Sequence, residues 1–189
     1  YGFRDLTEDE MKKVKKYPQI INVYQPSIVG NWPWKDDAAK ATFKLDRFNG
    51  LNGKKLQIKA FIFTYYNQRS DVVDLQKIYF ENGNKNEIIV CVGYDGNGVT
   101  WVRAFSWTDE KICENEAARF YTKDMKLEAL VDHMIPVWTA NWKRKEFSPL
   151  NELIHLTPST TAWITMIILQ IILVVGLTIA FKQNEFENE

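Results

Sequence analysis

Few side chains in this sequence could do chemistry, and each lies in a setting that favours a structural role. Cys91 and Cys113 form no CxxC pair, and His133 and His155 are too few for a cysteine/histidine zinc set. Cys91 lies in an alternating apolar stretch, where we expect a buried and inert thiol. His133 is beside Asp132 at the polar edge of an expected helix, where a solvated pair is the simplest interpretation, because a general base needs geometry that a sequence does not show.

The segment Asp95-Gly96-Asn97-Gly98 is similar to part of a calcium loop. The twelve-residue ligand spacing with its final bidentate glutamate is absent, so a hairpin turn is the better interpretation. No GxSxG, Walker, dinucleotide-binding or HExxH pattern occurs. The sequence therefore predicts no catalytic residue, no cofactor, no metal site and a protein that is not an enzyme.

Residues 162–181, AWITMIILQIILVVGLTIAF, carry no charge. At 1.5 Å per residue, a helix of about 20 residues spans the ~30 Å hydrocarbon core of a bilayer. Trp163 lies where an interfacial aromatic belongs, and Lys182 ends the run with a charge that can reach the headgroups. A buried helix in a soluble core is the alternative, but the length and lack of charge favour a C-terminal transmembrane anchor in a lipid bilayer.

Polar and small residues inside this run suggest a partner. An amide at Gln170, near the middle of the span, would lack hydrogen bonds in lipid, whereas a neighbouring helix can supply them. Gly176 and Ala180 form a small-xxx-small pair that permits close approach. We therefore expect Trp163, Gln170, Gly176 and Ala180 to contact the membrane or other subunits; a tolerated glutamine in a lone anchor is the alternative.

The charged residues indicate which classes of partner the protein lacks and on which side of the membrane the domain lies. The chain has 24 Lys and Arg against 24 Asp and Glu, so it lacks the basic surplus of a nucleic-acid-binding protein. Lys143, Arg144 and Lys145 on the domain side outnumber Lys182 on the tail side, which favours a domain in the cytoplasm or matrix. A cleaved leader before Tyr1 would override this orientation.

The soluble part is expected to be an α+β domain containing an antiparallel meander. Thr7 and Glu10 form a capping box for a helix reaching about Lys16, and Trp32 and Trp34 are expected to cover an edge of the core. Asn-Gly pairs and the DGNG turn separate alternating stretches, which predicts about five strands packed by N- and C-terminal helices. The strands are expected at 41–48, 55–66, 73–80, 87–94 and 99–107. A helix is the alternative for 73–80, with strand favoured.

Helix-forming residues follow the expected sheet. One face of the second helix is apolar and is expected to pack on the sheet, while Pro136 is expected to kink the helix or mark a restart. This face comprises Leu127, Leu130, Val131, Met134, Ile135, Trp138 and Trp142. The predicted organisation is a domain at 1–147, a juxtamembrane linker at 148–161, the span at 162–181 and a short acidic tail at 182–189.

The order of YPQIINVYQPSIVG, FKLDRFNGLNGKKLQIKAFIF and an ENGN turn resembles a mitochondrial inner-membrane domain family. That family contains cytochrome c oxidase assembly factors and a presequence-translocase subunit that contacts respiratory complexes. The resemblance implies an assembly role in the mitochondrial inner membrane. A second likeness is to TPM domains, some of which are phosphatases; it rests on LQIKAFIF, EIIVCVGYDGNGVTWVRAF and the later helices.

The leading hypothesis is a single-span accessory or assembly subunit of a larger, possibly respiratory, membrane protein complex, acting by protein–protein contacts. One alternative is a membrane-tethered TPM-type hydrolase, which would bring carboxylates and a metal together beside Asp95 or Asp109. Another is a structural membrane protein of a virus particle, which has the same anchor-plus-domain layout.

Overall fold

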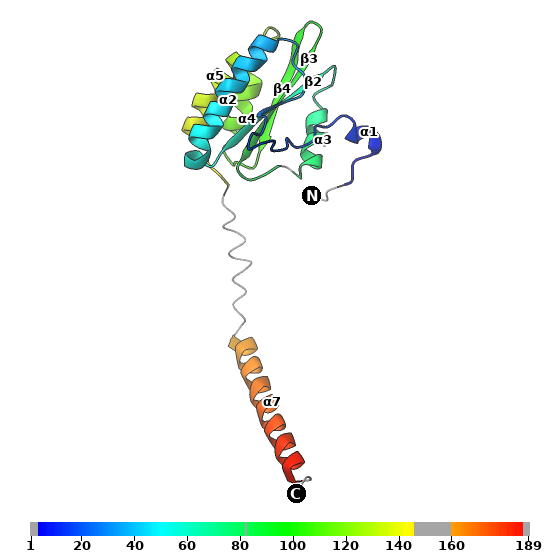
Figure 1. The fold of residues 1–189 in the computed structure, drawn as a ribbon, viewed down its shortest axis with the longest axis vertical. Helices are drawn as coiled ribbons and strands as arrows, with labels where there is room; N and C mark the ends of the chain where they lie inside the picture. Colours follow the sequence, from blue (N-terminus) through cyan, green and yellow to red (C-terminus); the bar gives the residue numbers. More distant parts are fainter. Residues whose placement is uncertain (1–3, 82, 146–159, 187–189) are drawn as a thin grey trace. The chain divides into compact units, whose positions relative to one another are not determined.

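A computed structural model describes residues 4–81, 83–145 and 160–186, with side chains in the last range described to residue 178. The chain forms two compact units, Tyr1–Lys145 and Glu146–Glu189. The first is an α+β domain and the second contains one long helix, α7 (Thr160–Phe186) (Figure 1). The predicted linker at 148–161 lies almost wholly outside the described residues, as does the end of the predicted tail.

The domain is built on a four-stranded sheet in the order β1-β2-β3-β4. The strands are β1 (Ile28–Val29), β2 (Lys59–Tyr66), β3 (Glu87–Asp95) and β4 (Gly98–Ser106). The helices of this unit are α1 (Glu8–Met11), α2 (Lys35–Leu56), α3 (Val72–Tyr79), α4 (Ile112–Arg119) and α5 (Leu127–Asn141). β1, β2 and β3 are parallel, and only β3 and β4 are antiparallel. The α+β class is therefore confirmed, but the five-stranded antiparallel meander is wrong.

The predicted hairpin at 41–66 is the main error, because its first strand and turn lie within helix α2. The buried residues Ala41, Leu45 and Phe48 are spaced four and three apart, which places them on one helical face. Phe43, which alternation would place beside Ala41 and Leu45, is instead exposed. The Asn-Gly pairs lie inside the helix and make no turn.

The predicted strand at 73–80 is also wrong, because helix α3 occupies Val72–Tyr79. In the chain, this helix joins the parallel strands β2 and β3. Its apolar face, with Val72 and Val73 buried, covers one face of the sheet. A parallel pair needs such a crossover, whereas a tight turn joins only antiparallel strands. Near the N-terminus the capping box of Thr7 and Glu10 is present, but α1 ends at Met11, before the expected end at Lys16.

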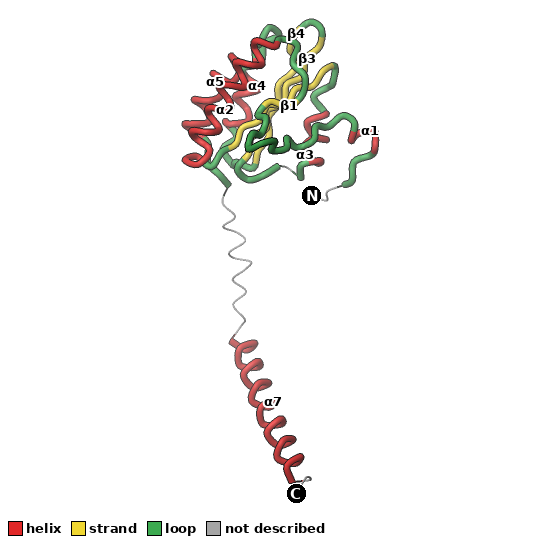
Figure 2. Tube along the Cα trace, viewed as in Figure 1, coloured by secondary structure: helices red, strands yellow, loops and turns green. Residues whose placement is uncertain are grey.

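The sheet separates two apolar clusters, and successive side chains of β2 and β3 point alternately into each. Ala60, Ile62 and Val90 pack under α2, α4 and α5, whereas Phe61 and Phe63 pack under α3. Figure 2 shows α2, α4 and α5 grouped on one side of the strands. Because both faces are covered, β2 and β3 are almost continuously buried, as is usual for parallel strands with helices on both faces.

Helix α5 turns its apolar face into the larger cluster. Leu127, Leu130, Val131, Met134, Trp138 and Trp142 are buried, and Ile135 is partly buried against the same cluster. The helix contacts α2 and α4 as well as the sheet. The helix continues through Pro136 to Asn141, so Pro136 does not mark the start of a new helix. Pro136 itself is exposed.

Candidate functional site

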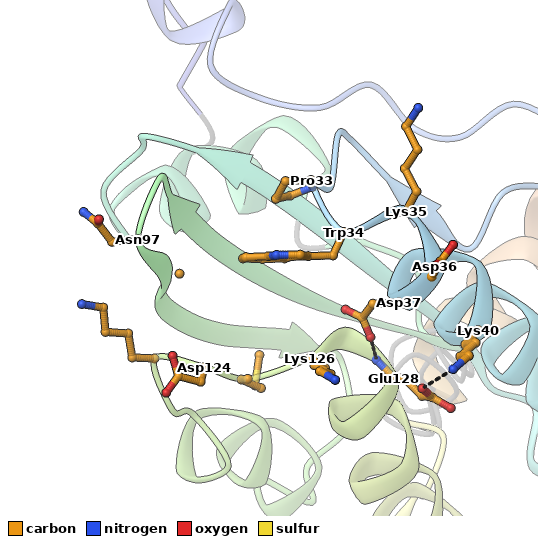
Figure 3. Close-up of a pocket in the computed structure, with 13 residues that line it drawn as sticks. Pro33, Trp34, Lys35, Asp36, Asp37, Lys40, Asn97, Asp124, Lys126 and Glu128 are labelled. Carbon is orange, nitrogen blue, oxygen red and sulfur yellow. Dashed lines mark hydrogen bonds and ion pairs between the residues drawn. The ribbon is translucent and has the colours of Figure 1, made fainter.

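A cleft of about 690 Å³ lies where three segments of the domain meet. The start of α2 forms one wall, the turn between β3 and β4 forms another, and the segment before α5 forms the third (Figure 3). We call this hollow the Trp34 cleft. It is lined by Pro33, Trp34, Lys35, Asp36, Asp37, Lys40, Asn97, Gly98, Lys123, Asp124, Met125, Lys126 and Glu128.

Asp37 holds two of these walls together. Its Oδ2 accepts hydrogen bonds from the backbone N–H of Leu127 at 2.8 Å and from Trp32 Nε1 at 2.9 Å. Its Oδ1 accepts the N–H of Glu128 at 2.9 Å. Helix α5 makes no cap with the side chain of its own N-cap residue, Lys126, so the carboxylate of α2 satisfies the free amides of its first turn. This buried acid therefore has a structural role.

The aromatic wall of the cleft is supported from behind. Trp32 contacts Trp34 and Tyr94 edge-on, with ring centroids 5.0 Å apart in each pair. Trp32 is buried, as expected for a residue covering the core, whereas Trp34 is 45% exposed. The Trp34 ring lies across the middle of the cleft in Figure 3. Within the described part of the chain, its indole N–H has no hydrogen-bond partner.

Charges of both signs surround this aromatic wall. Glu128 lies 2.8 Å from Lys44 Nζ and 4.0 Å from Lys40 Nζ. Asp132 is also 2.6 Å from Lys44, and the two carboxylates raise the pKa of that lysine. Lys35, Asp36, Lys123, Asp124 and Lys126 also line the cleft. Among the described residues, no group of three or more His, Cys, Asp or Glu side chains is placed to hold a metal ion. The cleft is suited to receive an apolar side chain of another molecule, with polar groups of that molecule facing the surrounding charges.

The chemically active side chains singled out in the sequence do not come together. Cys91 and Cys113 are buried, and desolvation raises the pKa of Cys91 to about 12 and that of Cys113 to about 11. Asp95 accepts the N–H of Asn97 at 2.7 Å in the β3–β4 turn, as in the expected hairpin. Asp109 lies beyond the other end of β4, where it pairs with Lys145 at 2.9 Å.

The surroundings of His133 also differ from the expectation. His133 stacks on Phe120, with centroids 4.4 Å apart, and its Nε2 lies 3.6 Å from Glu116. Asp132, the partner expected from the sequence, pairs with Lys44 instead. His155 lies outside the described residues.

Helix α7 contains the predicted span. Residues Thr160–Thr178 have a mean hydropathy of 2.2, so the helix is long and apolar enough to cross a membrane. Trp163 and Gln170 are exposed, and a Cβ added at Gly176 would meet no atom of the described residues within 4 Å. Within the described side chains, the Gln170 amide has no hydrogen-bond partner. Ala180 lies in the helix, but its side chain is outside the described part.

Sequence reasoning missed the Trp34 cleft and the role of Asp37. A signal for Asp37 was available, because the residue directly before Leu127 is Lys126, which is not one of the Ser, Thr, Asp or Asn residues that usually cap a helix. An uncapped first turn leaves free amides that a distant side chain can satisfy. No protein-family model, curated protein or solved structure matches this chain.

Proposed function

We propose that this chain is a single-span, membrane-anchored accessory or assembly subunit of a larger membrane protein complex, and that it acts through protein–protein contacts. The observation that carries this proposal is the unpartnered amide of Gln170 on a helix whose described side chains are all exposed. In lipid, an amide gains hydrogen bonds only from other protein groups, and each such interaction contributes about 0.6–2 kcal/mol. A partner helix would supply them.

The span offers more than one contact direction. With about 100° between successive residues, Gly176 lies about 120° from Gln170 around the helix, and Ala180 about 80°. One narrow seam cannot contain all three positions. A complex in which α7 contacts neighbours on several sides therefore fits better than a simple dimer of this helix.

The Trp34 cleft provides a contact surface in the domain. Partly exposed tryptophans in hollows are frequent energetic centres of protein interfaces, because they bury a large area and keep one hydrogen-bond donor available. Trp34 has this setting, backed by Trp32 and Tyr94 and flanked by lysines and acids. We propose that an apolar side chain of the partner enters the cleft beside the indole of Trp34.

Capture of a partner protein will identify the complex. The mitochondrial resemblance relied on paired strands around FKLDRFNGLNGK, and those residues lie in α2, so we do not carry that location forward. The hydrolase alternative relied on carboxylates meeting beside Asp95 or Asp109, which lie at opposite ends of β4. Partner identification will also separate a cellular complex from a virus particle.

Site-specific photo-crosslinking in native membranes tests this function. A crosslinking amino acid at position 170 should capture a discrete partner protein, and one at position 34 should capture the same or a second subunit. Val175 is the matched control in the span, because it lies about 100–140° from Gln170, Gly176 and Ala180 on an ideal helix. Position 175 should yield little protein and mainly lipid adducts.

Native gels after mild solubilisation give the second readout. The protein should migrate in a complex larger than its own 22.1 kDa, and Gln170→Leu should reduce the fraction that does so. Val175→Leu should leave it unchanged. Migration of the unaltered protein only as a free monomer, with no protein captured at positions 170 or 34, would contradict the proposal.

A further inference from the structure

The segment before β1 contains a tight turn that displays apolar side chains to solvent. The N–H of Ile21 donates to the Tyr24 carbonyl at 2.7 Å, and the N–H of Tyr24 donates to the Ile21 carbonyl at 2.9 Å. Ile20 is 70% exposed, Ile21 is 64% exposed and Val23 is 101% exposed. We call residues 20–24 the apolar turn.

The apex of the apolar turn has an unusual residue. Asn22 and Val23 have φ angles of 47° and 63°, the left-handed conformation that Asn and Gly adopt most easily. A valine is disfavoured there because its branched Cβ crowds the backbone, and full exposure gives it no compensating contact within the domain. Burial of Val23 against another molecule or a membrane would supply the favourable contact that the domain does not give it.

The apolar turn lies beside helix α2, where the Tyr24 hydroxyl donates to Asp46 Oδ2 at 3.0 Å, and its flanking residues contact the end of the domain where β2 and β3 begin. Gln25 Nε2 donates to the Pro18 carbonyl at 2.8 Å and closes the base of this loop, while the hydroxyl of neighbouring Tyr17 donates to Glu87, the first residue of β3. The chain leaves the domain at this end too, because Arg144 donates to Gln57, two residues before β2.

The length of the intervening chain sets an upper bound on the distance between Lys145 and the start of α7. Fifteen Cα–Cα steps separate Lys145 from Thr160, a distance of at most about 50 Å when fully extended. Lys54 and Lys55 lie in the last turn of α2 at the same end, and neither has an ion-pair partner among the described residues. Exposed aliphatic residues, tyrosines and unpaired lysines together suit the lipid–water interface, where each group finds its preferred surroundings.

We propose that the apolar turn is a second membrane contact, in which Ile20, Ile21 and Val23 enter the interface of the bilayer that holds the chain. Lipid is favoured over a protein as the occupant of this surface for two reasons. The tether makes the bilayer available at a high effective concentration, so a small apolar area suffices. Val23 also stands at a projecting apex, a shape that enters soft headgroups more readily than it fills a protein groove.

Depth-dependent quenching tests this contact in the full-length protein. Because Cys91 and Cys113 are buried, Val23→Cys introduces a thiol that a polarity-sensitive fluorophore can label selectively. The labelled protein is reconstituted into phosphatidylcholine vesicles, with and without phosphatidylserine and with spin-labelled acyl chains as quenchers. Emission from position 23 should shift to the blue and be quenched by the labelled lipid.

Asn97→Cys is the matched control, because Asn97 is exposed in the β3–β4 turn at the opposite end of β3. Its label should show neither the shift nor the quenching. Changing Lys54 and Lys55 together to Gln should reduce quenching at position 23 on the anionic vesicles and leave it unchanged on phosphatidylcholine. Equal quenching at positions 23 and 97, none at either, or shielding of position 23 only when a partner protein is added would overturn the proposal.

Discussion

At the scale of single residues, Asn49 links helix α2 to the edge of the sheet. β1 pairs with only Ile62 and Phe63 of β2, so the backbone of Ala60 faces an edge without a strand. The Asn49 side chain takes the place of that strand: its Oδ1 accepts the Ala60 N–H at 2.8 Å, and its Nδ2 donates to the Ala60 carbonyl at 2.9 Å. One buried amide thus joins helix α2 to the sheet.

Replacement of Asn49 by Ala should lower the free energy of unfolding by about 2–4 kcal/mol, because both backbone groups of Ala60 would be left buried without partners. Urea unfolding of the detergent-solubilised chain, followed by tryptophan fluorescence, measures this change. Asn52→Ala is the control in the same helix, since the side chain of Asn52 bonds to the Phe48 carbonyl of its own helix at 3.3 Å and to no other described residue. A loss no greater than that of the control would show that the Asn49 bridge is unimportant.

The two thiols should be unreactive in the folded chain. Their pKa values, about 12 for Cys91 and about 11 for Cys113, lie above the ordinary value of 9.0, so both stay protonated at pH 8. Iodoacetamide should modify them only after unfolding, as mass spectrometry would show. The shifts also stabilise the fold below about pH 9, and this contribution should be lost as pH rises from about 9 to 12. Rapid native modification at pH 8 would contradict the buried positions.

At the scale of elements, helix α2 shows how a local pattern can mislead. The stretch ATFKLDRF alternates between apolar and polar residues, and Asn-Gly follows, which together are typical of a hairpin. The same residues also place Ala41, Leu45 and Phe48 on one helical face. The sheet needed a helix there, because only a crossover can return the chain to pair β2 in parallel with β1.

Replacement of a glycine by alanine distinguishes a helix from a hairpin turn by the sign of the change in stability. Gly50 lies inside α2, and a Cβ added there would meet nothing within 4 Å, so Gly50→Ala should stabilise the protein by about 0.5–1 kcal/mol. Gly98, in the true hairpin turn, has a φ of 136°, and a Cβ would lie 2.5 Å from the Lys123 carbonyl oxygen. Gly98→Ala should therefore destabilise it. Thermal unfolding measures both; destabilisation by Gly50→Ala would favour a turn at that position.

At the scale of the whole molecule, both apolar clusters lie within the first unit, and among the described residues neither includes one beyond Trp142. A fragment of residues 1–145 should therefore fold without the anchor. Hydrogen-exchange mass spectrometry should find the same protection in β2 and β3 as in the full chain. A fragment that ends at Lys126 lacks α5, exposes the larger cluster and should lose that protection. Equal protection in both fragments, or none in the longer one, would refute this division.

The sequence by itself determined those features that depend on nearby residues. The uncharged run at 162–181, the capping box of Thr7, the DGNG hairpin turn and the apolar face of α5 all follow from composition or spacing over a few turns of chain. Each of these features is set by local geometry or by the transfer of a whole segment out of water. Neither of these two causes depends on contacts between residues that are distant in the chain.

Only the tertiary structure decided which stretches became strands and where the cleft lies. The helices at 35–56 and 72–79 are crossovers between parallel strands, and the pairing that demands them joins residues far apart in the chain. The Trp34 cleft likewise arises because Asp37 caps Leu127 from 90 residues away. A local pattern compatible with both helix and strand is resolved by the long-range contacts that bury it, because those contacts outweigh the small differences in intrinsic propensity.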